Sequence, residues 1–224
     1  MLSMTGPCTR LGILLSALIV VFGVIGLTMH QDFYENQTRK DFFCFYTNVS
    51  NLTVLLYFAI ASPRLYARPS LHVLIPHVEF AVMMCIMLTC CVFHLILFPP
   101  LFKTALHMPH TREYYIVCID NLIIHYLVPL MVLIYWLLCS PQKRGFGAAD
   151  ILYWTALPIV YLSWIFLRAK SNAMIEETGS PYPYPFLDMD ALGTVPVLRI
   201  CAGLYGLCVL IGLLVITMIR LVPS

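Results

Sequence analysis

The sequence predicts an all-α polytopic membrane protein, built as a bundle of six transmembrane helices. Of its 224 residues, 61% are hydrophobic and only 11% are charged, and the mean hydropathy is +0.87. These values lie far outside the usual balance of a soluble globular domain. The hydrophobic residues also gather into six runs, each close to the roughly 20 residues that a helix needs to cross a bilayer.

The six expected spans follow one another with mostly short connections, and we expect them to form a single integral membrane domain, residues 1–224. The first run has no clean small-residue cleavage site, so we interpret it as a helix and not as a signal peptide. Prolines punctuate the pattern, with Pro63 after the second run, Pro99 after the third and Pro141 after the fourth. The expected spans are residues 11–29, 43–62, 73–98, 115–139, 151–167 and 197–221.

An even number of spans places both termini on one side of the membrane. Basic residues are nearly balanced between the two sides, so the positive-inside rule does not decide the orientation. The acidic residues gather opposite the termini, which favours cytoplasmic termini. The formal charge is only +2 and the basic residues are scattered, so we expect no nucleic-acid partner.

Four neighbouring polar residues interrupt the second apolar run: Thr47, Asn48, Ser50 and Asn51. Residues three and four apart share a helix face, so Thr47, Ser50 and Asn51 form one polar stripe. In a membrane this stripe must face other helices or trapped water. It either joins helices through hydrogen bonds worth about 0.6 kcal/mol each, or it belongs to a functional site.

The fourth expected span contains Asp120, Asn121 and His125. An ionised aspartate at the centre of a span costs roughly 2.5–3.5 kcal/mol, so such residues are functional candidates by default. Asn121 and His125 are four residues apart and share a face. Asp120 points about 140° away from His125, toward a different helix.

Counting about 1.5 Å per residue from the expected helix starts places these side chains in one half of the membrane. Thr47 is expected about 6 Å deep, Asn51 about 12 Å and His125 about 15 Å, all from the side opposite the termini. His94 reaches the same leaflet near the end of the third span. A contact between Thr47 and His125 must therefore overcome an offset of about 9 Å through helix tilt or shifted boundaries.

The loop before the last span reads SPYPYPFLDMDALG, and it lies on the same side as this polar cluster. Its prolines restrict the backbone and its aromatic residues suit the membrane interface, so we expect a rigid lid. With the intramembrane residues, this loop would complete a possible pocket. Its expected members are His94, Asp120, Tyr184, Phe186 and Asp188.

Five motifs occur in a distinctive order: YTNVSNL, LTCCVFHLILFPP, NLIIHYLVPLMVLIYWLL, LPIVYL and YPYPFLD. Together they resemble the bacterial six-helix Pr-six-Pr membrane proteins, which are relatives of the androgen-induced and androgen-dependent regulator proteins of vertebrates. The resemblance covers nearly the whole chain and implies a bacterial cell membrane. It also implies a membrane hydrolase of fatty acid esters of hydroxy fatty acids. By position in the helices, its threonine nucleophile and its histidine fall on Thr47 and His125.

The chemistry of these residues is compatible with that activity. A neutral His125 would accept the proton of Thr47 while the hydroxyl attacks an ester carbonyl, and water would later release the acyl group. Asn121 would orient His125. The residues that would donate a hydrogen bond to the oxyanion are Asn48, Ser50 and Asn51.

Two other interpretations stay open. The first is a non-catalytic bundle, such as a transporter, a lipid-binding protein or a sensor, in which the polar stripe lines a cavity. The second is a metal site at His94 and His125, although no third ligand at a suitable spacing is evident. We expect a lipid or fatty-acyl substrate, surrounding membrane lipids, and no cofactor or metal; the sequence leaves the oligomeric state open.

Overall fold

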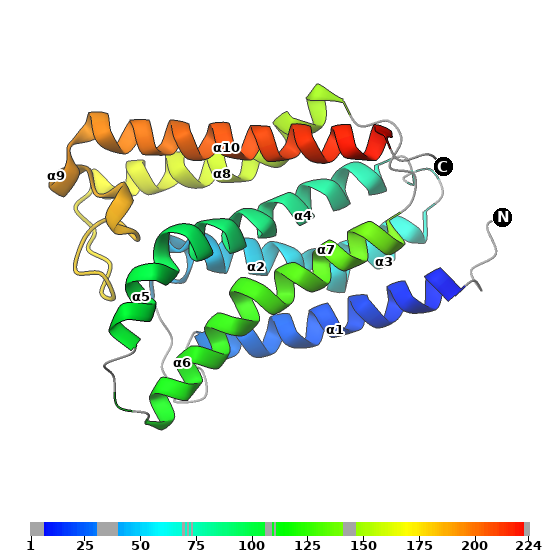
Figure 1. Ribbon diagram of the computed structural model, residues 1–224, viewed down its shortest axis with the longest axis horizontal. Helices are drawn as coiled ribbons and strands as arrows, with labels where there is room; N and C mark the ends of the chain where they lie inside the picture. The colour runs from blue at the N-terminus through cyan, green and yellow to red at the C-terminus, as the bar shows by residue number, and fades with distance from the viewer. Residues whose placement is uncertain are drawn as a thin grey trace. The chain divides into compact units, whose positions relative to one another are not determined.

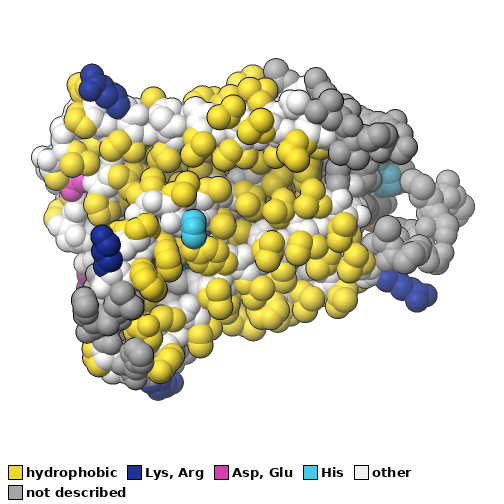
Figure 2. Space-filling model, in the orientation of Figure 1, with side chains coloured by type: hydrophobic (Ala, Val, Ile, Leu, Met, Phe, Trp, Pro, Cys, Tyr) yellow, Lys and Arg dark blue, Asp and Glu magenta, His cyan; other side chains and the backbone are white. Residues whose placement is uncertain are grey.

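The computed structural model describes residues 7–30, 40–68, 70, 72, 74–105, 109, 111–140 and 147–221. Within these residues the regular structure is helical, apart from an isolated bridge between Ile175 and Ser180. Hydrophobic side chains predominate on the face shown in Figure 2. In the described part of the chain, five helices are long and apolar enough to cross a membrane: Arg10–His30, Ile75–Lys103, Tyr114–Cys139, Ala149–Ala169 and Thr194–Ile219. The prediction of an all-α membrane protein is confirmed at this level.

The second expected span, residues 43–62, is helical from Tyr46 onward but is not among these five. It consists of α2 (Tyr46–Leu56), the π-helix η3 (Tyr57–Ala61) and α3 (Ser62–Tyr66), which follow one another without a break. The polar stripe lies in the first turns of α2 and makes this run less apolar than the others. The count of six membrane spans therefore stays a prediction.

The described residues form two compact units, and the prediction of a single domain stays a prediction. Unit 1 comprises residues 1–39 and 47–142, and unit 2 comprises residues 40–46 and 143–224. Besides α2, η3 and α3, the helices of unit 1 are α1 (Pro7–His30), α4 (Ile75–Val92), η5 (Phe93–Leu97), α5 (Phe98–Ala105), α6 (Arg112–Leu122), η6 (Ile123–Leu127) and α7 (Val128–Cys139). The expected start of the third span at Val73 lies outside the described residues.

Each π-helix of unit 1 is followed, after one residue, by a proline. In η6 the N–H of Val128 bonds to the carbonyl of Ile123, five residues before it. In the same register the carbonyl of Ile124 would need the N–H of residue 129, which is Pro129 and has none. The wider π turn also separates the proline ring from the preceding carbonyls, with which it would clash in an α-helix.

The same arrangement occurs in η3 before Pro63 and in η5 before Pro99. The helical runs therefore continue past both prolines, to Tyr66 and Ala105, although the sequence pattern predicted helix ends there. In each case the π turn accommodates the N–H that the proline lacks. The three π-helices also place side chains of the polar clusters described below.

Helix α7 occupies the centre of unit 1, where it packs against α1 and α4 (Figure 1). Helix α1 also contacts α6 and η6, and Gly26 allows this close approach. A Cβ atom on Gly26 would lie 2.6 Å from Cγ2 of Ile124 and 2.7 Å from Cγ2 of Ile123. The largest fully buried side chains of this unit are Ile19, Ile75, Phe80, Met83, Ile86, Ile124 and Trp136.

Unit 2 contains η2 (Phe42–Cys44), α8 (Ala148–Ala169), η7 (Pro185–Leu187), α9 (Met189–Leu192) and α10 (Thr194–Leu221). Helices α8 and α10 pack side by side, with Trp154 against Gly212. The loop after α8 is held by Arg168, which donates to the carbonyl of Ala173 at 2.7 Å and pairs with Asp41 at 3.3 Å. This loop is thus fixed within its own unit by charged hydrogen bonds.

Candidate functional site

Thr47 and His125 lie in contact inside unit 1. The Thr47 Oγ1 atom is 3.3 Å from the His125 Nε2 atom, and the two residues are 7% and 4% exposed. The depth offset expected from the sequence assumed that both helices start level. In the structure α6 begins at Arg112, several turns before His125, whereas α2 begins at Tyr46, directly before Thr47. The uneven starts bring the two side chains together.

The second ring nitrogen of His125 faces a backbone carbonyl. Its Nδ1 lies 3.3 Å from the carbonyl oxygen of Asn121, and a carbonyl can only accept. With the proton on Nδ1, Nε2 carries the lone pair and the Thr47 hydroxyl donates to it. Asn121 was expected to orient His125, but its side-chain amide donates elsewhere, to the Val117 carbonyl at 2.7 Å and to Asp120 at 3.2 Å. The backbone of Asn121 orients the imidazole instead.

Asn51 joins α2 to η6 beside this pair. Its Nδ2 donates to the carbonyl of Thr47 at 2.9 Å and to the carbonyl of Ile124 at 3.2 Å. The Ile124 carbonyl is the one that Pro129 leaves without a backbone donor. The amide therefore satisfies an acceptor that the π turn creates, and it ties the threonine backbone to the helix that carries His125.

Ser50 belongs to the same buried network, since its Oγ is 3.0 Å from the Thr47 carbonyl and 2.6 Å from Oγ1 of Thr89 in α4. The sequence analysis missed Thr89, because a single threonine in an apolar run carries no local signal. The Ser50 hydroxyl and the Asn51 amide nitrogen point at these partners and not into open space. Asn48 is also buried, at 1% exposure. The oxyanion role of Asn48, Ser50 and Asn51 stays a prediction.

Phe93 covers one face of the His125 ring. The two ring centroids are 3.7 Å apart and the planes differ by 18°. Phe93 is 5% exposed and is the first residue of η5, so the π-helices η5 and η6 meet at this stack. Such π turns occur frequently at functional sites. An aromatic residue in an apolar run gave no reason to select Phe93 from the sequence.

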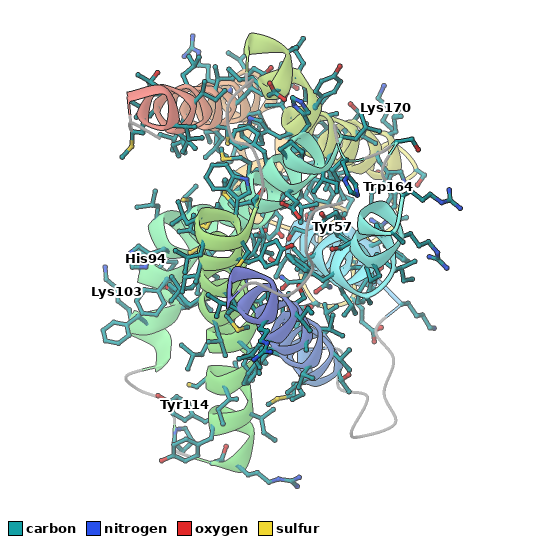
Figure 3. All side chains as sticks on the ribbon, turned by 90° about the vertical axis from the view of Figure 1, so that its right-hand side faces the viewer. Tyr57, His94, Lys103, Tyr114, Trp164 and Lys170 are labelled. Atoms are coloured by element: carbon teal, nitrogen blue, oxygen red, sulfur yellow. The ribbon has the colours of Figure 1, made fainter. Side chains whose placement is uncertain are left out.

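His94 is not brought to the Thr47–His125 pair. It is exposed, its Nδ1 lies 3.0 Å from the hydroxyl of Tyr126, and its ring stacks on Phe98. Figure 3 shows His94 and Lys103 at the periphery of the helices. Because Phe93 points at His125, the next side chain along the helix is directed about 100° away.

Asp120 pairs with a different helix, as its direction predicted. Its Oδ2 lies 2.9 Å from Nδ1 of His30, the last residue of α1. The sequence analysis missed His30, which directly follows the first expected span. This pair ties the end of α1 to α6, one residue before Asn121.

The three expected pocket residues of the proline-rich loop belong to unit 2. The Tyr184 hydroxyl accepts from the backbone N–H of Tyr46 at 3.0 Å, and its ring stacks on Phe186 with centroids 5.3 Å apart. Asp188 caps α9, because its carboxylate accepts hydrogen bonds from two backbone N–H groups at the start of that helix. The loop is well connected, and its function as a lid stays a prediction.

A second buried polar cluster surrounds Glu79 of α4. The hydroxyls of Tyr57 and Tyr135 donate to its Oε1 at 2.9 and 3.1 Å, and Glu79 is 3% exposed. Tyr57 is the first residue of η3 and is labelled in Figure 3. These hydrogen bonds link η3, α4 and α7 within unit 1.

Among the described residues, no group of three or more histidine, cysteine, aspartate or glutamate side chains could hold a metal ion. Comparison with protein-family models, with curated proteins and with solved structures gives no match for this chain. The resemblance to the Pr-six-Pr proteins therefore stays a prediction.

Proposed function

We propose that this protein is an intramembrane hydrolase of lipid esters, such as fatty acid esters of hydroxy fatty acids, with Thr47 as nucleophile and His125 as base. The observation that carries the proposal is the 3.3 Å contact between Thr47 Oγ1 and His125 Nε2. A nucleophile within hydrogen-bond reach of a base that a third group orients is the arrangement of covalent hydrolases. The carbonyl of Asn121 is the third group here.

The proposed reaction has two halves. Thr47 Oγ1 attacks the ester carbonyl while its proton moves to His125 Nε2, and the alcohol leaves with that proton. The acyl group is then bonded to Thr47. Water attacks it, His125 takes a proton from the water and returns it to the Thr47 oxygen, and the fatty acid is released. The residues of the chain suffice for both halves, and no cofactor takes part.

The surroundings favour a lipid substrate. Both side chains are almost fully buried in a unit whose long helices are apolar, so an ester dissolved in the bilayer has the shortest path to them. A site that excludes water also strengthens the electrostatic interactions on which such a reaction depends. We place the protein in a bacterial cell membrane with cytoplasmic termini, as a member of the group that its motifs resemble.

The test is covalent labelling of the detergent-solubilised full chain with a fluorophosphonate probe. We expect wild type to be labelled at Thr47, as mapped by mass spectrometry, and Thr47→Ala and His125→Ala to lose labelling by at least about 100-fold. Thr53→Ala is a matched control, because Thr53 lies on the same helix and its hydroxyl donates to the Val49 carbonyl of that helix. Thermal unfolding and gel filtration verify that all variants are folded.

Two results would contradict the proposal: labelling that persists in Thr47→Ala, or a well-folded wild type that is not labelled. The second result would favour a transporter, lipid-binding protein or sensor. A positive result would justify a screen of lipid esters that differ in chain length and in the position of the branch. Hydrolysis would be followed by the fatty acid released.

A further inference from the structure

The imidazole of His125 is constrained in three directions. In the plane of the ring, Nδ1 faces the Asn121 carbonyl and Nε2 faces the Thr47 hydroxyl, both at 3.3 Å. Across the plane, the Phe93 ring lies nearly parallel, with centroids 3.7 Å apart. Rotation of the imidazole about either of its last two bonds would break at least one of these contacts.

The stack differs from the other ring contacts of Phe93. Phe93 meets Phe98 at 6.1 Å with planes tilted by 52°, and it meets Tyr126 edge to face at 5.8 Å. Neutral aromatic pairs prefer such offset or edge-to-face arrangements, with centroids about 4.5–7 Å apart. The close parallel placement over His125 instead presents the electron-rich face of the phenyl ring to the imidazole.

That face attracts a cation. An aromatic face stabilises a positive charge within about 6 Å of its centroid, and the attraction is stronger where water is excluded. Phe93 is 5% exposed and His125 is 4% exposed, so the stack is dry. In the resting pair His125 is neutral, so the phenyl face stabilises it little. Once the proton of Thr47 Oγ1 has moved to Nε2, the ring carries a full positive charge directly over the phenyl face.

We propose that Phe93 is a positioning residue that also stabilises the imidazolium of His125 during ester cleavage. The proposal rests on the proposed function, because it needs Thr47 to transfer its proton to His125. The proton leaves Oγ1 as the oxygen bonds to the ester carbon, the charge on the imidazole balances the oxyanion, and the leaving alcohol removes the proton again. Since the charge exists only during the reaction, Phe93 accelerates the chemical step and leaves substrate binding unchanged.

The experiment replaces Phe93 with phenylalanines that carry one, two or three fluorine atoms on the ring. Fluorine withdraws electrons from the face and leaves the ring shape nearly unchanged, so packing is preserved. The rate of fluorophosphonate labelling of the full chain is measured over a range of probe concentrations. The resulting saturation curve gives the maximal rate and the probe concentration at half saturation separately. We expect the maximal rate to fall with each fluorine, by about 2- to 30-fold over the series. The half-saturating concentration should stay constant.

Phe58 provides the matched control. It is 4% exposed in the same unit and packs edge to face on Tyr135, away from His125, so fluorination there should leave the labelling rate unchanged. A second variant, Phe93→Leu, keeps an apolar side chain without a π face and should lose about 10-fold in maximal rate.

The outcomes separate this inference from the proposed function. If wild type is labelled but the maximal labelling rate does not change over the fluorinated series at Phe93, the role of Phe93 is overturned, and Thr47 and His125 remain as nucleophile and base. The same holds if fluorination lowers the maximal rate equally at Phe93 and at Phe58. A change in the half-saturating probe concentration alone would also overturn the role of Phe93, because a packing defect would alter probe binding and not the chemical step. A folded wild type that is not labelled would overturn both proposals.

Discussion

Replacement of Asn51 by leucine tests how the two halves of the site are held together. Leucine has a similar shape but no amide, so the hydrogen bonds to the carbonyls of Thr47 and Ile124 are both lost. Hydrogen bonds between membrane helices average about 0.6 kcal/mol and reach about 1.7 kcal/mol. The loss per bond should lie toward the upper part of that range, because Pro129 has no N–H to donate to the Ile124 carbonyl in place of the amide. For the two bonds together we expect the free energy of unfolding to fall by about 1–3 kcal/mol.

The same substitution should impair the reaction. Asn51 holds the backbone of Thr47 against η6, so without it the hydroxyl is no longer fixed at 3.3 Å from His125. A misplacement of about 1 Å can cost about 100-fold in rate, and we expect fluorophosphonate labelling to slow by at least about 10-fold. Unfolding is measured by denaturant titration in mixed micelles, and labelling is measured on the same preparation.

Thr53→Val is the control for Asn51→Leu. Thr53 lies on the same helix, but its hydroxyl donates at 2.8 Å to the Val49 carbonyl of that helix. We expect this variant to unfold and to react like wild type. The bridging role of Asn51 would be refuted if Asn51→Leu matched Thr53→Val in both measurements.

Two further substitutions follow from the structure. Gly26→Ala would place a Cβ atom 2.6 Å from Cγ2 of Ile124, so it should destabilise the protein by about 1–3 kcal/mol. Gly203→Ala is the control and should leave the stability unchanged, because a Cβ atom there meets nothing within 4 Å. Equal thermal unfolding of the two variants would contradict the close approach of α1. Asn121→Ala should change the labelling rate by less than about 3-fold, since the backbone carbonyl and not the amide orients His125. A loss comparable to that in His125→Ala would show that the side chain is needed.

Much of the architecture could be predicted from local sequence. Long apolar runs predict spanning helices because an unpaired backbone in hydrocarbon is too costly for other structures. Thr47 and His125 could be counted among the candidates because polar side chains in such runs are expensive and need a partner. Their choice as a pair rested on the family resemblance. The partners themselves, such as Thr89 and His30, could not be selected, since they are not unusual for their own segments.

The helix ends near Pro63 and Pro99 were predicted less well, for a related reason. A proline removes one N–H and crowds the carbonyls of the preceding turn, and a chain can respond by ending the helix or by widening one turn. The choice depends on whether a neighbouring group satisfies the freed carbonyl. Near Pro129 that group is the amide of Asn51, which is remote in sequence.

The sequence alone thus determined that the chain is helical, that it belongs in a membrane, and that two of its apolar runs carry neighbouring polar residues, one from Thr47 to Asn51 and one from Asp120 to His125. These properties follow from the cost of placing each residue in hydrocarbon, which is a local quantity. The tertiary structure decided that the Asn121 backbone faces Nδ1 of His125 and that Phe93 covers its ring. Such contacts depend on how far each helix is shifted and rotated against its neighbours, and the packing of the whole unit sets those displacements.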